Sequence, residues 1–124
     1  MAVSLAAAFI VWGIVGIFIP FVYDMNDDLF MRAFVSGAYT GNPDAHMIYM
    51  EYPLGLFLKL LYTIRRNIDW YGLWLMGCHY FSLGLCICRV LQEAKGKKRK
   101  LAVMGLTILA FAALWMSRSV ILTF

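Results

Sequence analysis

The sequence predicts an all-α membrane protein, with three transmembrane helices and two amphipathic surface helices in the first extracytoplasmic loop. Hydrophobic residues make up 63% of the chain, whereas soluble domains contain roughly 45–50%. Residues 2–23 carry no charge, and about 20 apolar residues suffice to cross a bilayer. The acidic residues other than Glu93 fall within residues 24–69, whereas a basic cluster occupies residues 95–100. We therefore expect residues 1–124 to form a single membrane domain.

The three transmembrane helices are expected at about residues 4–22, 70–88 and 101–117. In the first, Gly13 and Gly16 offer a face of small residues for close helix packing. The second begins at Trp70, a residue type that favours the membrane interface. The third extends to residue 124 if Arg118 finds a partner.

The positive-inside rule sets the expected topology. The basic loop 89–100 is short, so its lysine and arginine residues favour retention in the cytoplasm. The N-terminus is then cytoplasmic, and residues 24–69 form an extracytoplasmic loop of a multi-pass protein of the cell membrane. Because no basic face is interleaved with aromatic residues, we expect no nucleic-acid partner.

Two helices are expected inside the extracytoplasmic loop. In the first, Asn26 is a plausible N-cap and Gly37 can end the helix. The second starts at Pro53 and carries an apolar stripe: Leu54, Phe57, Leu58, Leu61 and Ile64. A stripe of about 12 residues is too short to span a bilayer, so this helix is expected to lie along the membrane surface in contact with lipid.

The carboxylates of this loop have structural and functional interpretations. Asp27 and Asp28 fall in a first helical turn, where acidic residues offset the helix macrodipole, but they also lie close to the membrane surface, where a carboxylate can meet a lipid headgroup. Glu51 immediately precedes the second surface helix, and capping does not require a carboxylate there. Asp44 follows a proline at a turn, so we expect its side chain to bond nearby backbone.

Four sequence elements in this loop resemble the GT-C class of membrane glycosyltransferases, which use lipid-linked sugar donors. These elements are Asp27-Asp28, Arg32, Ser36-Gly37-Ala38-Tyr39 and Glu51-Tyr52-Pro53-Leu54. The last is similar to the Glu-x-Pro-Pro-Leu element of aminoarabinose and related bacterial transferases, although it is only partly kept. The topology, with a first span leading into a long acidic loop, also resembles the N-terminal part of that class.

The resemblance implies transfer of a sugar from a polyprenyl phosphate to an extracytoplasmic hydroxyl or amine. Such a reaction needs a carboxylate to take the acceptor proton and cationic help for the departing phosphate. Asp27 or Asp28 is the implied base, and Glu51 either orients the acceptor or shares a divalent cation with Asp28. Arg32 either holds the phosphate or pairs with Asp28 at helical spacing. His46 is a further candidate for phosphate or metal contact, the alternative being a solvated loop histidine.

The resemblance covers only the beginning of such an enzyme, since members of this class have many more spans. We therefore expect a truncated catalytic-loop portion that is inactive alone and needs the missing helices or another membrane subunit. The rival hypothesis is a small non-enzymatic membrane scaffold or a transporter accessory subunit. The enzyme hypothesis predicts that Asp27, Asp28 and Glu51 converge on one cavity, whereas the scaffold hypothesis predicts that they point separately to water.

Overall fold

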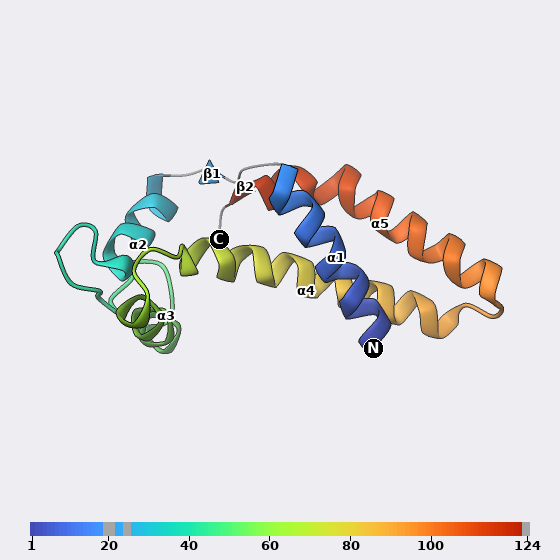
Figure 1. Ribbon diagram of the computed structural model, residues 1–124, viewed down its shortest axis with the longest axis horizontal. Coiled ribbons are helices and arrows are strands. Elements are labelled where there is room, and N and C mark those ends of the chain that lie inside the picture. Colours follow the sequence, from blue (N-terminus) through green and yellow to red (C-terminus); the bar gives the residue numbers. More distant parts are fainter. Residues whose placement is uncertain (19–21, 24–25, 123–124) are drawn as a thin grey trace. The chain divides into compact units, whose positions relative to one another are not determined.

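The computed structural model describes residues 1–18, 22–23 and 26–122, with the side chains of residues 26 and 115–122 excepted. The order of elements is α1 (Ala2–Phe18), β1 (Val22–Tyr23), α2 (Asn26–Ser36), α3 (Tyr52–Ile64), α4 (Trp70–Glu93), α5 (Lys97–Val120) and β2 (Ile121–Leu122) (Figure 1). The two strands have two residues each and pair with each other. The predicted all-helical fold is thus confirmed. The expected end of the first span and the side chains of Asn26 and Arg118 lie outside the described residues.

One helix among the described residues, α4, is both long and apolar enough to cross a membrane. The apolar helices α1 and α3 have 17 and 13 residues, fewer than a typical span of about 20. A membrane-associated protein is therefore supported by one helix, and three spans remain an expectation.

The chain forms two compact units. Unit 1 comprises residues 1–22 and 76–121, and unit 2 comprises residues 23–75 with residues 122–124. Helix α4 contributes its first residues to unit 2 and the remainder to unit 1.

Unit 1 is held together by close packing of α1, α4 and α5. Its buried core consists of Ala8, Tyr80, Leu83 and Ile87, with apolar residues of all three helices around it. A Cβ added to Gly84 would lie 2.9 Å from the Cδ2 atom of Leu5 and 3.5 Å from the Cβ atom of Ala8. The small residues that allow this close approach are therefore Ala8 and Gly84.

Gly13 and Gly16 do not provide the close packing expected from the sequence. Among the described residues, apart from the chain neighbours and the nearby backbone of α1 itself, no atom lies within 4 Å of a Cβ built on either residue. Their spacing is typical of a helix interface, but the fold turns Ser4 and Ala8, both buried, toward the core instead.

The predicted loop 89–100 is longer than the loop observed. Helix α4 continues through Arg89, which pairs with Glu93 at 2.9 Å across one turn, and α5 already begins at Lys97. Charged side chains exposed to solvent do not terminate a helix. The break occurs at Gly96, whose φ of 85° is favourable for glycine and strained for other residues.

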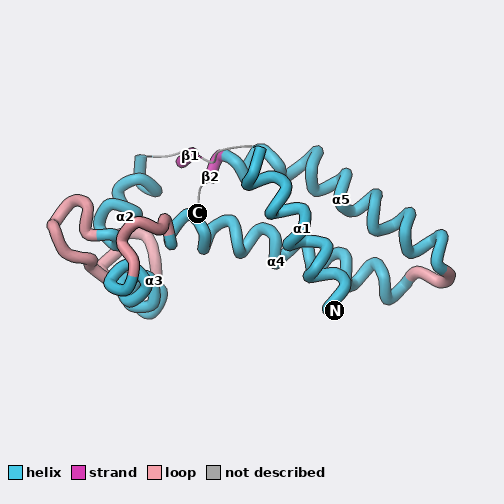
Figure 2. Tube along the Cα trace, viewed as in Figure 1, coloured by secondary structure: helices cyan, strands magenta, loops and turns pink. Residues whose placement is uncertain are grey.

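Unit 2 contains α2 and α3, which form where the sequence predicts the two surface helices. Helix α2 ends at Ser36, and Gly37 follows with a φ of 78°. Pro53 lies in the first turn of α3. The connection between the two helices, drawn as loop in Figure 2, crosses Gly55 so closely that a Cβ there would overlap the carbonyl oxygen of Ala45.

Candidate functional site

Asp28 is completely buried at the start of α2. Its Oδ1 atom accepts a hydrogen bond of 2.8 Å from the Tyr71 hydroxyl, which comes from the first turns of α4. Its Oδ2 atom has no hydrogen-bond partner among the described residues. An unpaired buried polar atom costs about 1–3 kcal/mol of folding free energy. Stability therefore does not explain why a carboxyl group is buried at this position.

A second carboxylate, Asp69, joins four segments of unit 2. Its Oδ2 atom accepts hydrogen bonds from the Tyr23 hydroxyl at 2.7 Å and from Nε of Arg32 at 2.8 Å. Its Oδ1 atom accepts from the Tyr62 hydroxyl at 2.9 Å and from the backbone N–H of Gly72 at 3.2 Å. Through the bond from Gly72, the Asp69 side chain caps the N-terminus of α4, which starts at Trp70.

The two carboxyl groups are linked through their tyrosine partners. The backbone N–H of Tyr71 donates to the Tyr62 hydroxyl at 3.1 Å, while the Tyr71 side chain bonds Asp28. Asp28 and Arg32 are one helical turn apart on α2, so they share a face that is directed toward α3 and α4. This set of hydrogen bonds, which we call the Asp69 network, consists of Asp28, Tyr23, Arg32, Tyr62, Asp69 and Tyr71.

Burial and charge shift the acidity of this network. Desolvation raises the pKa of Tyr23, and its hydrogen bond to Asp69 raises that pKa further. Desolvation likewise raises the pKa of Tyr62 and outweighs the hydrogen bond from the Tyr71 N–H, which lowers it, while Asp69 contributes a further increase. Burial alone would lower the pKa of Arg32, but the neighbouring Asp69 raises it above its ordinary value. The tyrosines are therefore held neutral and the guanidinium charged.

Arg32 pairs with Asp69, not with Asp28 as one interpretation of the sequence had it. Asp69 was not singled out from the sequence, because its partners Tyr23 and Arg32 precede it by 46 and 37 residues. The available signal was local: an aspartate directly before an apolar run is a preferred N-cap.

Asp27 differs from its neighbour in exposure. Its side chain is partly exposed, and among the described residues it has no hydrogen-bond or ion-pair partner. Successive residues of an α-helix are rotated by about 100°, so Asp27 and Asp28 cannot face the same way. The acidic pair thus provides one buried and one accessible carboxylate.

Within the described part of the chain, Glu51 makes no hydrogen bond or ion pair with Asp27 or Asp28. Glu51 is exposed at the N-cap position of α3, where its side chain makes no capping hydrogen bond. The Asp69 network contacts α3 at Tyr62, eleven residues later, which is about 16 Å along a helix axis. No three metal-ligating side chains gather among the described residues.

His46 lies in the loop between α2 and α3 and is exposed. Its backbone N–H and its Nδ1 atom approach Oδ1 of Asp44 at 3.0 Å and 2.8 Å. The backbone bond first, and the side-chain bond second, lower the pKa of Asp44. The Asp44 side chain therefore bonds nearby backbone as predicted, and the His46 ring is hydrogen-bonded to the same carboxylate.

A recess of about 370 Å³ opens beside the Asp69 network. Its charged members are Arg32, Arg66 and Asp69, and the other residues that line it are Ser36, Gly37, Ala38, Tyr62, Asn67 and Ile68. Arg66 donates from one Nη atom to the carbonyl oxygen of Gly41 at 3.1 Å. No local pattern in the sequence indicates that Arg32 and Arg66, on different segments, line the same recess.

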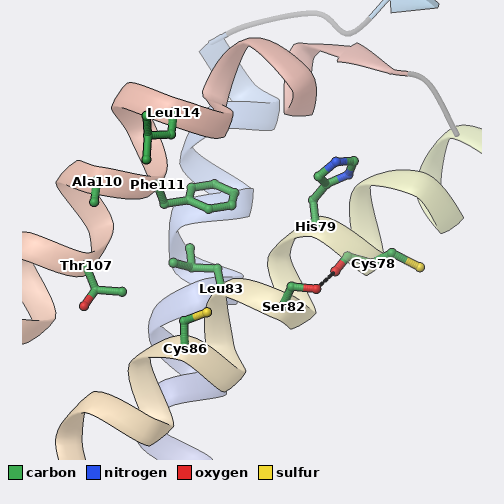
Figure 3. Close-up of a pocket in the computed structure, with 9 residues that line it drawn as sticks. All are labelled: Cys78, His79, Ser82, Leu83, Cys86, Thr107, Ala110, Phe111 and Leu114. Carbon is green, nitrogen blue, oxygen red and sulfur yellow. Dashed lines mark hydrogen bonds between the residues drawn. The ribbon is translucent and has the colours of Figure 1, made fainter.

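A second cavity, of about 490 Å³, lies between α4 and α5 in unit 1 (Figure 3). Its hydroxyl groups are bonded within their own helices: Ser82 donates to the carbonyl of Cys78 and Thr107 to that of Val103, each at 2.8 Å. The remaining lining is mainly apolar, with Leu83, Phe111 and Leu114 among its members.

No family model, no curated protein and no solved structure matches this chain.

Proposed function

We propose that the chain is the N-terminal catalytic-loop portion of a membrane glycosyltransferase of the GT-C type, which transfers a sugar from a polyprenyl phosphate to an extracytoplasmic acceptor. The observation that carries the proposal is the division of the acidic pair, one carboxyl group buried and the other accessible, in a unit that also has a recess lined by two arginines. Deprotonation of an acceptor and support of a departing phosphate need these two kinds of group.

The surface of unit 1 supports a membrane location with three spans. The outward side chains of α1 and α5 are apolar and 53–79% exposed: Val3, Phe9, Ile10, Ile14, Ile17, Phe18, Leu101, Leu106, Leu109 and Leu114. Soluble monomers rarely expose a contiguous apolar surface of more than a few hundred Å². Lipid is the solvent that suits these residues, with the lysine-rich start of α5 in the cytoplasm.

Helix α3 supports an orientation along the membrane surface. Gly55, Leu58 and Tyr62 are buried against unit 2, whereas Leu56, Phe57, Leu60 and Ile64 are 45–68% exposed. A helix with one apolar face turned away from its own protein can insert that face at the lipid boundary. The catalytic loop would then lie against the bilayer from which a lipid-linked donor comes.

Asp27 is the base in this proposal. A general base must come within about 2.6–3.2 Å of the acceptor proton, and Asp27 is the member of the pair that an acceptor can reach in this conformation. Asp28 positions α2 through Tyr71. The proposal gives no shared cation to Asp28 and Glu51, since no three metal-ligating side chains gather among the described residues, and assigns His46 no phosphate contact.

The test uses membranes that contain the protein together with the further spans that the proposal requires, supplied with polyprenyl phosphates carrying labelled hexoses or pentoses. Asp27→Asn should lower sugar transfer at least about 100-fold, the effect expected for loss of a general base. Asp44→Asn is the matched control, because this residue lies in the same predicted loop and its side chain bonds His46 of its own turn.

Equal transfer by the Asp27→Asn variant and the unchanged protein would exclude Asp27 as the base. If no polyprenyl phosphate sugar in the panel loses its label to an acceptor, the scaffold hypothesis is favoured. Membrane insertion, measured by labelling of the lysines at residues 95–100 from the cytoplasmic side, should be the same for all variants.

A further inference from the structure

We infer that the recess formed by Arg32 and Arg66 binds a phosphate group. This inference deepens the proposed function, since a polyprenyl phosphate sugar carries such a group, but phosphate binding can be measured without any sugar transfer.

The first argument is charge. Two arginines and one aspartate line the recess, so it has a formal charge of +2 − 1 = +1. The Asp69 carboxylate is already shared among four donors. It therefore holds Arg32 in place without cancelling the positive charge of the second arginine.

The second argument is the set of unused donors. Among the nitrogen atoms of Arg32, only Nε donates a hydrogen bond to the Asp69 carboxylate. The carbonyl oxygen of Gly41 accepts one from a single Nη atom of Arg66. Within the described part of the chain, the remaining N–H groups of both guanidinium groups have no hydrogen-bond partner. Guanidinium groups bind phosphate oxygens through pairs of such N–H groups.

The third argument is preorganisation and size. The bond from Nε of Arg32 to Asp69 fixes the plane of this guanidinium group, so less side-chain entropy is lost when an anion binds. The volume of about 370 Å³ is near the lower end of the range for small-ligand sites, roughly 300–1,000 Å³. It therefore has room for a phosphate together with part of the group that it carries.

A purely structural role of Arg66 is the alternative, since cations near a helix C-terminus offset the macrodipole and α3 ends at Ile64. Arg65 would serve that role equally well, because it is adjacent, exposed and outside the recess. Arg65→Gln is therefore a matched control for Arg66→Gln: both remove one positive charge at the end of α3, but only Arg66 lines the recess.

The experiment measures binding by titration calorimetry with the full chain in neutral phosphatidylcholine nanodiscs. One arm adds inorganic phosphate, and the other compares nanodiscs with and without farnesyl phosphate. Arg66→Gln should weaken binding at least about tenfold, as expected for loss of a charge-assisted hydrogen bond, whereas Arg65→Gln should change it less than about twofold. Binding in the farnesyl phosphate arm alone identifies a lipid headgroup as the ligand, and binding of inorganic phosphate identifies the free ion.

A second variant guards against misfolding of the first. Ala38 is exposed and lines the recess, so Ala38→Leu should fill the recess and weaken phosphate binding without removing a charge. Absence of binding in both arms would overturn the inference, as would equal losses in Arg65→Gln and Arg66→Gln. Because phosphate binding is measured without sugar transfer, failure of the base assignment in the transfer assay is distinguishable from failure of the phosphate site.

Discussion

Units 1 and 2 are stabilised by different interactions. In unit 1, helices α1, α4 and α5 approach through small residues such as Ala8 and Gly84 around an apolar core. In unit 2, short helices and loops are joined by hydrogen bonds from tyrosine and arginine side chains to Asp69 and Asp28. The comparison teaches that unit 1 depends on the shape of its packed helices, whereas unit 2 depends on protonation and charge.

Removal of the Asp69 carboxylate should give the largest difference between the units. Asp69→Ala leaves four donors without their acceptor, and we expect unit 2 to lose about 3 kcal/mol or more of stability. Hydrogen exchange, resolved by peptide, should show faster exchange in α2 and α3, while the peptides of residues 97–114 keep their protection. Equal acceleration in both units would mean that they unfold as one.

A change of shape in unit 1 should have a smaller effect. Gly84→Leu places a side chain against Leu5 and Ala8 of α1, and overpacking of this kind typically costs about 1–3 kcal/mol. Gly77→Leu, on the same helix with no atom within 4 Å of its Cβ, is the control. Cross-linking between cysteines introduced on α1 and α4 should fall for Gly84→Leu only, and an unchanged yield would contradict the observed packing.

Alkaline pH should distinguish the units without any mutation. The pKa values of Tyr23 and Tyr62 are raised in the folded chain above their ordinary value of 10.0. Their contribution to stability is therefore fully present below about pH 10 and decreases as the pH rises above this value, because only the unfolded state then releases these protons. Thermal unfolding of unit 2 should shift to lower temperature above pH 10, whereas that of unit 1 should shift less. The double variant Tyr23→Phe/Tyr62→Phe should reduce this pH dependence.

The local signals of unit 2 were sufficient to predict its helices from the sequence. Gly37 ends α2 and Pro53 starts α3, since each affects backbone geometry within a few residues. Helix α4 was also expected at Trp70, although its continuation to Glu93 was not, because exposed charges do not stop a helix.

The candidate site was only partly predictable. Asp28 and Arg32 were identified, but the role of Asp69 depends on contacts between segments that are 37 and 46 residues apart, which no helical periodicity reveals. Glu51 was grouped with the aspartates through a motif, and among the described residues no hydrogen bond or ion pair joins it to them. Gly13 and Gly16 had a favourable spacing but not the right orientation toward a neighbouring helix.

The unpaired Oδ2 atom of Asp28 has a consequence for directed evolution. A library of variants selected for heat resistance alone should discard this aspartate early, because an apolar side chain removes the uncompensated oxygen. A screen for catalytic output should retain it if the carboxyl group serves the reaction. Comparison of the residues enriched at this position in the two screens would show whether the carboxyl group is retained for stability or for catalysis.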